Sequence, residues 1–177
     1  MSLSIIIPTL NEEAALPATL KSVAALNPAP VEVIVADSGS DDRTVDIARA
    51  YGVQVITDLP PGRAGQMNAG ARSAVGDQLC FLHADTEIPA DFVSLVDGVL
   101  SDPRTALAGF ISIMRGESGV RRVTTAHNFL KTWYAPLLFR TISFFRGARL
   151  LFGDQVIVCR RRDFEAVGGW DPDQKIM

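Results

Sequence analysis

The sequence predicts an α/β domain in which helices cover both faces of a mostly parallel β-sheet. Short runs of apolar and β-branched residues alternate with helix-like segments over the first two-thirds of the chain. These runs are apolar throughout, which is typical of parallel strands that are buried on both faces. A chain of 177 residues with 47% apolar and 21% charged residues has the length and composition of one globular domain. A single domain over residues 1–177 is therefore expected.

The predicted elements follow one another as a βαβαβαβ series, which gives a parallel sheet. Pro17 suits the first turn of a helix, and Gly52 and Gly76 suit helix ends. Apolar residues at helical spacing over residues 123–137 indicate a further helix, which Pro136 should kink or end. Strands are predicted at residues 3–7, 31–36, 53–57, 78–82, 106–114 and 156–160. Helices are predicted at residues 17–25, 42–51, 64–75, 91–100 and 163–167.

Polar residues collect directly after four of the predicted strands. In doubly wound sheets, ligands bind outside the carboxyl ends of the strands, so these clusters predict one binding site at that edge. The clusters are Thr9, Asn11 and Glu12 after the first strand, residues 37–42 after the second, Gly62 and Arg63 after the third, and residues 83–85 after the fourth.

Common nucleotide and hydrolase motifs are absent from the sequence. No GxGxxG turn follows the first strand, which argues against a dinucleotide-binding dehydrogenase. The sequence has no GxxxxGK[ST] loop, which argues against a P-loop NTPase, and no GxSxG elbow, which argues against an α/β-hydrolase.

Three residues of the polar clusters have specific chemistry. Asp85 follows a buried strand and can bind Mg²⁺ or Mn²⁺ beside substrate phosphates, or it can cap the next turn. Asp37 stands at the end of the second strand, where we expect it to be free to accept hydrogen bonds from a base or ribose. Arg63 near a helix start suits a diphosphate, although the small residues around it also suit close packing with Arg63 in solvent.

Four segments, in order and spacing over nearly the whole chain, resemble the family 2 glycosyltransferases with the GT-A fold. They are residues 5–13 (IIIPTLNEE), residues 33–44 (VIVADSGSDDRT), residues 63–70 with Asn68-Ala69-Gly70, and residues 81–86 (FLHADT). The HADT and Gly153-Asp154-Gln155 segments resemble a bacterial subgroup of radical-SAM/selenodomain-associated transferases. The resemblance implies a Rossmann-like GT-A sheet sandwiched by helices. It also implies a nucleotide-sugar-binding half (residues 1–114) and an acceptor-side half (residues 115–177).

The resemblance further implies a role for each matched residue. Asp37 would contact the base, usually uracil, and Arg63 and Asn68 would lie near the base, ribose and diphosphate. Asp85 matches the last aspartate of the family's DxD motif, which binds Mn²⁺ or Mg²⁺. Asp154 and Gln155 would lie on the acceptor side. The residues implied in nucleotide binding are Pro8, Thr9, Asn11, Glu12, Asp37, Ser38, Gly39, Arg63, Asn68 and Ala84.

The chain departs from the family pattern in two places. His83 stands where the motif usually begins with aspartate, and it is either a metal ligand or an orienting, packing residue, since Mg²⁺ prefers oxygen. The family's base is an aspartate in a Glu-Asp pair that follows a segment like residues 169–177, and this sequence ends before such a pair. A C-terminally truncated domain is therefore expected, with Asp154 as the only candidate catalytic base inside the chain.

The sequence thus predicts an inverting, metal-assisted glycosyltransferase that uses a nucleotide-diphosphate sugar, typically a UDP-sugar, and an acceptor hydroxyl. An alternative is a catalytically inactive nucleotide-binding or interaction module, because the last motif is missing. A related nucleotidyltransferase would need a loop rich in glycine and arginine after the first strand, and residues 8–11 (PTLN) are not such a loop.

Charge and aromatic residues are distributed unevenly. The net charge is −8 over residues 1–114, +8 over residues 115–162 and −3 over residues 163–177. Residues 120–152 hold seven of the 13 aromatic residues and six basic residues. This segment is either a helix and loop that cover the core, or an interfacial patch that holds a lipid-linked or anionic acceptor near the inner membrane surface. Nucleic acid is not expected as a partner, since no recognition motif accompanies the charge.

The cysteines and the N-terminus bear on location. Cys80 and Cys159 lie in apolar runs, which predicts two buried free thiols in a reducing compartment. The N-terminus lacks a signal-peptide pattern, and the chain lacks a run of about 18 uncharged apolar residues. We therefore expect a cytoplasmic protein without a transmembrane segment, peripheral at the inner membrane face if the basic aromatic patch is functional.

Overall fold

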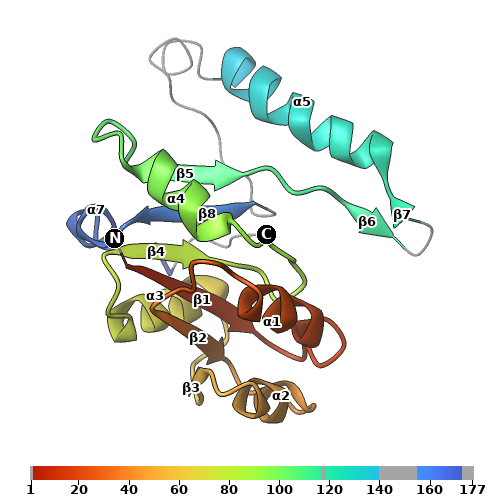
Figure 1. The fold of residues 1–177 in the computed structure, drawn as a ribbon, viewed down its shortest axis with the longest axis vertical. Coiled ribbons are helices and arrows are strands. Elements are labelled where there is room, and N and C mark those ends of the chain that lie inside the picture. The colour runs from red at the N-terminus through yellow and green to blue at the C-terminus, as the bar shows by residue number, and fades with distance from the viewer. Residues whose placement is uncertain (1, 117–118, 140–154, 173–177) are drawn as a thin grey trace. The chain divides into compact units, whose positions relative to one another are not determined.

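The structure is a computed structural model that describes residues 2–116, 119–139 and 155–172 (Figure 1). Six strands form one sheet in the order β3-β2-β1-β4-β8-β5. β1 pairs in parallel with both β2 and β4, and β2 pairs in parallel with β3. The predicted α/β fold with a mostly parallel sheet is confirmed. The strands are β1 (Leu3–Thr9), β2 (Glu32–Asp37), β3 (Gln54–Ile56), β4 (Gln78–Phe81), β5 (Leu107–Phe110) and β8 (Val156–Arg160).

The direction of the strand order reverses at β1. From β1 the chain proceeds to β2 and β3 on one side, and it then returns to place β4 on the other side. Such a reversal leaves a crevice outside the carboxyl ends of the central strands, where doubly wound proteins bind their ligands. The register of β1 and β2 brings Thr9 and Asp37 opposite each other at that edge.

Helices cover both faces of the sheet, with α1 and α4 on the near side and α3 on the far side in Figure 1. Pro17 lies in the first turn of α1, as predicted. The second helix begins two residues later than predicted, because the Asp42 carboxylate accepts a hydrogen bond from the Thr44 backbone N–H and holds the preceding turn. The helices are α1 (Leu16–Ala24), α2 (Thr44–Ala50), α3 (Arg63–Ser73), α4 (Phe92–Leu100) and α7 (Arg161–Ala166).

The core consists of the central strands and the apolar faces of the helices. Cys80 and Cys159 are buried and form no disulfide with each other, which confirms the prediction of two free buried thiols. Burial, together with the charge of Asp163, raises the pKa of the Cys159 thiol to about 12, so the thiol stays protonated at neutral pH.

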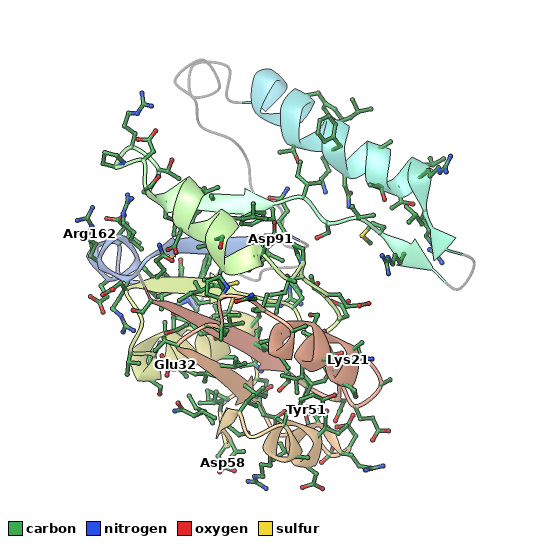
Figure 2. All side chains as sticks on the ribbon, in the orientation of Figure 1. Lys21, Glu32, Tyr51, Asp58, Asp91 and Arg162 are labelled. Carbon is green, nitrogen blue, oxygen red and sulfur yellow. The ribbon has the colours of Figure 1, made fainter. Side chains whose placement is uncertain are left out.

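The amino-terminal edge of the sheet is closed by a polar network that does not contribute to the predicted site. The Ser4 hydroxyl donates to the Glu32 carboxylate and accepts a hydrogen bond of 2.9 Å from the Gly76 backbone N–H. Glu32 is labelled in Figure 2, at the first residue of β2. Any Cβ on Gly76 would approach Ser4 Oγ to 2.6 Å, so glycine is required there for space.

The described residues fall into two compact units. Residues 1–108 and 158–177 belong to the first unit, and residues 109–157 belong to the second. The second unit contains the two-stranded hairpin of β6 (Arg115–Gly116) and β7 (Gly119–Val120), which the sequence did not predict, and the helix α5 (Arg122–Phe139). No helix in the described parts of the chain is both long enough and apolar enough to span a bilayer.

Two predictions about this region differ from the structure in part. The α5 helix continues past Pro136 to Phe139, so it does not end at the proline, and a kink there stays a prediction. The strand predicted at residues 106–114 is only Leu107–Phe110, since the chain leaves the sheet there and turns into the hairpin. The division of donor and acceptor binding between residues 1–114 and 115–177 stays a prediction.

Gly70→Ala should destabilise the fold by about 1–3 kcal/mol, because overpacking a filled core displaces side chains and backbone. A Cβ at Gly70 would overlap the side chain of Ile6, which is β-branched, fully buried and unable to move aside. Gly65→Ala is the matched control on the same helix, since a Cβ there meets nothing within 4 Å. Chemical denaturation should show a loss of stability for the first variant and none for the second. Equal stabilities would contradict the close approach of α3 to β1.

Candidate functional site

The carboxyl ends of β1 and β2 are joined through the buried carboxylate of Asp37, which is only 1% exposed. Asp37 Oδ1 accepts hydrogen bonds from the backbone N–H groups of Gly39 at 2.9 Å and Ser40 at 2.8 Å. Asp37 Oδ2 accepts from the hydroxyls of Thr9 at 2.9 Å and Ser40. A carboxylate offers about four acceptor positions, so these bonds occupy them. The expectation that the Asp37 side chain has no other partners is wrong, because it bonds to both loops. Its predicted contact with the base stays a prediction.

Gln66 completes this junction, and sequence reasoning missed it. Its side-chain Nε2 donates to the carbonyl of Thr9 at 2.7 Å and to that of Ala36 at 2.8 Å. The side chain thereby satisfies two backbone acceptors where β1 and β2 end, and it ties α3 to both strands. A signal was present, since a polar residue in a helix that is otherwise lined by small residues must find buried partners.

The loops that follow β1 and β2 are also bonded to each other. The Asn11 backbone N–H donates to Ser40 Oγ at 2.8 Å, and Asn11 Oδ1 accepts from the Asp41 N–H at 2.9 Å. Asn11 has a φ of +56°, a conformation that asparagine tolerates better than most residues. The Glu12 N–H donates to Thr44 Oγ1 at 2.8 Å. The two loops therefore form one rigid platform.

The segment after β4 is held by α1. The carbonyl of Ala84 accepts a buried hydrogen bond of 2.7 Å from Thr19 Oγ1, and the Thr86 N–H donates to the carbonyl of His83 at 3.2 Å. His83 is half-buried and Asp85 is exposed. The backbone is thus fixed at Ala84, while the next carboxylate projects into solvent at the carboxyl edge of the sheet.

Three charged residues from different loops share one electrostatic neighbourhood. Partial burial raises the pKa of Glu12, the negative charge of Asp85 raises it further, and the positive charge of Arg63 partly offsets both. Glu12 follows β1, Arg63 begins α3 and Asp85 follows β4, so the edge brings together residues that are far apart in sequence. This grouping agrees with the predicted ligand site.

The chemistry of these groups fits a divalent cation that a ligand helps to bind. Within residues 2–116, 119–139 and 155–172, no three His, Cys, Asp or Glu side chains gather as a metal cage. Mg²⁺ and Mn²⁺ at nucleotide sites need only one or two protein carboxylates, because phosphate oxygens and water complete the shell. Asp85, with Glu12 nearby, supplies that number of oxygen donors.

The remaining predicted nucleotide residues line the same edge. Pro8 is half-buried beside Ala36, and Gly39 has a φ of +89° that suits the turn after β2. Ser38 is 7% exposed, and its Oγ has no hydrogen-bond partner among the described residues. A buried hydroxyl without a partner is costly, so this group is the one in the turn that a bound ligand can satisfy.

The side chain of Asn68 binds the backbone of Trp170, 102 residues away. Its Nδ2 donates to the carbonyl of Trp170 at 2.8 Å, and its Oδ1 accepts from the Trp170 N–H at 2.9 Å. Both ends of the side-chain amide are therefore bonded to one residue, which the sequence did not predict. The predicted place of Asn68 near the base, ribose and diphosphate stays a prediction.

An aromatic cluster supports the same segment. The Trp170 ring packs edge-on against Phe81, with 5.4 Å between centroids, and against Phe164 at 6.1 Å. A Cβ on Gly169 would approach Asn68 Oδ1 to 2.8 Å, and the φ of Gly169 is +80°. Phe81 ends the strand that leads to His83, so the segment around Trp170 is anchored to β4 as well as to α3.

The predicted acceptor-side residues are only partly described. Asp154 lies outside the described residues. Gln155 is buried in the second unit, where its Nε2 donates to Thr132 Oγ1 at 3.2 Å. An acceptor role for either residue stays a prediction.

A cavity of about 270 Å³ lies between α3 and α7, away from the predicted site. It faces the middle and the end of α3, whereas Arg63 is the first residue of that helix. The lining residues are Asn68, Ala71, Arg72, Leu79, Arg161, Phe164, Glu165, Gly168 and Gly169.

The chain is similar to known glycosyltransferases. The profile described as "Glycosyl transferase family 2" matches residues 4–168. A PGL/p-HBAD biosynthesis glycosyltransferase of Mycobacterium bovis (strain BCG) is 42% identical over 91 residues, which cover 48% of this chain and 36% of that protein. An uncharacterized glycosyltransferase of Mycobacterium tuberculosis is 32% identical over 89 residues, which cover 50% of this chain and 39% of that protein.

Solved glycosyltransferase structures have the same fold. A mannosyltransferase from Pyrobaculum calidifontis, in complex with GDP-Man and Mn²⁺, matches 98% of this chain and 48% of its own, with a TM-score of 0.71 and 21% identity. Glucosyl-3-phosphoglycerate synthase of Mycobacterium tuberculosis, in complex with Mn²⁺, UDP and glucosyl-3-phosphoglycerate, matches 91% of this chain and 57% of its own, with a TM-score of 0.60 and 22% identity. The predicted GT-A fold is confirmed. The chain spans little more than a third of the mycobacterial relatives and about half of these structures.

Glu12→Gln should raise the melting temperature at pH 7 and lose that advantage near pH 4. The folded protein disfavours the charged carboxylate, so stability is complete below the ordinary pKa of 4.5 and is lost as the pH rises through the raised folded pKa. Glutamine removes this loss. Scanning fluorimetry over pH 4–8 measures the difference, with exposed Glu87→Gln as the control. An effect that is independent of pH would contradict an electrostatic origin.

Asn68→Ala should lower the free energy of unfolding by about 1–3 kcal/mol, because the backbone N–H and carbonyl of Trp170 lose their partners. Exposed Ser73→Ala on the same helix is the control and should stay within about 0.5 kcal/mol of the wild type. Urea denaturation followed by circular dichroism measures both variants. An Asn68→Ala protein as stable as the control would show that the paired bonds do not hold the segment.

Proposed function

The chain belongs to glycosyl transferase family 2, and we propose that it transfers a sugar from a UDP-sugar to an acceptor hydroxyl in an inverting, metal-assisted reaction. The observation that carries the proposal is the grouping of Glu12, Arg63 and Asp85 at the carboxyl edge of the sheet, where the charges of Arg63 and Asp85 both act on Glu12. Opposite charges that project from fixed loops suit a ligand that carries both phosphates and a cation.

The nucleotide would lie over the ends of β1 and β2. The Ser38 hydroxyl, which lacks a partner among the described residues, can bond to a base or ribose oxygen. Asp37 contributes indirectly, because it holds the turn in which Ser38 and Gly39 lie. A bound nucleotide agrees with the UDP in the mycobacterial synthase and the GDP-Man in the archaeal mannosyltransferase. Uracil is proposed from the resemblance of residues 33–44 to the family pattern. Pro8, Thr9, Asn11, Glu12, Arg63 and Ala84 would form the rest of the pocket wall.

Asp85 would hold a Mn²⁺ or Mg²⁺ ion together with the donor diphosphate. The Mn²⁺ in the similar structures supports the use of a divalent ion. When bound, the ion stabilises negative charge on the departing diphosphate. Arg63 would add a positive charge at the start of α3, where the helix dipole also favours an anion. We assign His83 an orienting role, since it is half-buried beside the fixed backbone of Ala84.

The transfer would proceed as one in-line displacement. The acceptor oxygen attacks the anomeric carbon, the bond from that carbon to the diphosphate oxygen breaks, and the acceptor proton passes to a carboxylate base. Asp154 is the candidate base within the chain. An aspartate of a Glu-Asp pair, of the kind that follows residues 169–177 in the family, is the other candidate. The two hydrogen bonds between Asn68 and Trp170 would then hold the segment that leads to this Glu-Asp pair.

The acceptor would be a lipid-linked or otherwise anionic hydroxyl compound, reached from the cytoplasmic side at the inner membrane face. The excess of basic and aromatic residues in residues 120–152 supports this assignment. Asp154 and Gln155 would lie on the acceptor side.

Titration calorimetry with UDP and GDP, with and without Mn²⁺, tests the proposal. UDP should bind more tightly with Mn²⁺, and Asp85→Asn should reduce that metal enhancement by at least about tenfold, because the ion loses its protein carboxylate. Asp91→Asn removes another exposed carboxylate from the same connection and should have no effect.

If neither nucleotide binds with or without Mn²⁺, the transferase proposal is wrong. An undiminished metal enhancement in Asp85→Asn would remove Asp85 from the metal site. Intact binding without donor hydrolysis or transfer would favour a catalytically inactive nucleotide-binding module.

A further inference from the structure

The polar face of α5 is turned inward. The Thr125 hydroxyl accepts a hydrogen bond of 3.0 Å from the Met114 N–H, and the buried Thr132 hydroxyl accepts from Gln155 Nε2 at 3.2 Å and donates to the carbonyl of Asn128 at 3.0 Å. Positions 125, 128 and 132 fall on one face of a helix. That face is therefore bonded to the rest of the second unit through hydroxyl groups.

The opposite face of α5 is exposed and carries large apolar side chains together with exposed His127. Val123 is 85% exposed, Leu130 is 58% exposed and Tyr134 is 42% exposed. At 100° per residue, these three positions lie on the far side of the helix from Thr125 and Thr132. A helix on the surface of a water-soluble domain normally shows the reverse arrangement, with its apolar stripe toward the core. The inverted pattern leaves an apolar stripe that other residues of the described second unit do not cover.

Among the described residues of the second unit, the lysine and arginine side chains are the only ones of fixed charge. Arg115, Arg121 and Arg122 are exposed on the hairpin and at the start of α5, and Lys131 lies within the helix. The described residues of the second unit, 109–116, 119–139 and 155–157, contain no aspartate or glutamate. A surface that joins apolar side chains to basic ones is complementary to a layer of acyl chains beneath anionic headgroups.

We propose that the outward face of α5 docks on an anionic membrane surface, with the helix lying in the plane of the interface. Val123, Leu130 and Tyr134 enter the boundary between headgroups and acyl chains, and Arg121 and Arg122 contact phosphate groups. Tyr134 suits this depth because its ring is apolar and its hydroxyl is polar. The docking itself does not depend on the proposed function. Only its purpose does, which is to bring a transferase to a lipid-linked acceptor.

Vesicle co-sedimentation tests the docking surface. The chain should bind vesicles of phosphatidylcholine with about 30% phosphatidylglycerol more tightly than pure phosphatidylcholine, and salt should weaken the binding. The double variant Val123→Ser, Leu130→Ser should lose at least about tenfold in vesicle partitioning, because two apolar contacts are removed. The matched control is Val75→Ser, Val167→Ser, since these side chains of the first unit are 70% and 77% exposed and should be dispensable.

A second variant separates charge from apolar contact. Arg121→Gln, Arg122→Gln should reduce binding to the anionic vesicles and remove most of the salt dependence. Circular dichroism on each variant shows that α5 is still folded, as expected for substitutions of exposed side chains.

Three results would overturn the proposal. The first is a wild type that binds neither vesicle, and the second is an equal loss of binding in the two double serine variants. The third is a dimer, seen by sedimentation, that Val123→Ser, Leu130→Ser breaks while vesicles have no effect, in which case a second copy covers the face. UDP titration with Mn²⁺ on the same proteins keeps the two proposals apart. Failed vesicle binding with intact nucleotide binding overturns docking alone, and the converse overturns the donor site alone.

Discussion

The buried carboxylate of Asp37 is the interaction on which the candidate site depends. A carboxylate that is shielded from water is costly unless donors satisfy it, and here Thr9, Gly39 and Ser40 supply four hydrogen bonds. The donors come from the end of β1 and from the turn after β2. Satisfying one side chain therefore fixes two loops relative to each other. The groups that those loops expose are therefore held in place. Fixed dipoles and charges stabilise the charge that develops in the transition state of an enzyme reaction.

The α3 helix connects the carboxyl edge of the sheet to other parts of the first unit. Near its start, Gln66 bonds to the carbonyls at the ends of β1 and β2, and two residues later Asn68 binds the backbone of Trp170. Gly70 lets the helix approach Ile6 closely enough for both bonds to form. One helix thus fixes the edge where the nucleotide is proposed to bind and also the segment that leads beyond residue 172.

The sequence predicted most of the sheet and proposed a candidate site, but it did not predict the partners of individual side chains. Buried strands were evident because their runs are apolar throughout, and the candidate site followed from polar clusters at their ends. The internal bonds of Asp37 and Asn68 were missed for the same reason. Sequence shows that a side chain can accept or donate, but not that Thr9 or Trp170, at separations of 28 and 102 residues, already bonds to it. Likewise, periodicity predicted the helix around residue 130 but not which of its faces turns outward.

The internal bonding distinguishes residues that hold the fold from residues that carry charge at the candidate site. Asp37, Gln66 and Asn68 bond within the fold, and Glu12, Arg63 and Asp85 share one electrostatic neighbourhood at the carboxyl edge. Burial and the charge of Asp85 already raise the pKa of Glu12, so the two negative charges disfavour each other. The bonds around Asp37 and Thr44 fix the loop that carries Glu12, and the bond from Thr19 to the Ala84 carbonyl fixes the backbone next to Asp85. A divalent cation with a diphosphate can relieve the repulsion, because the cation neutralises the carboxylates while the phosphates complete its shell. The repulsion between Glu12 and Asp85 therefore favours the proposed metal.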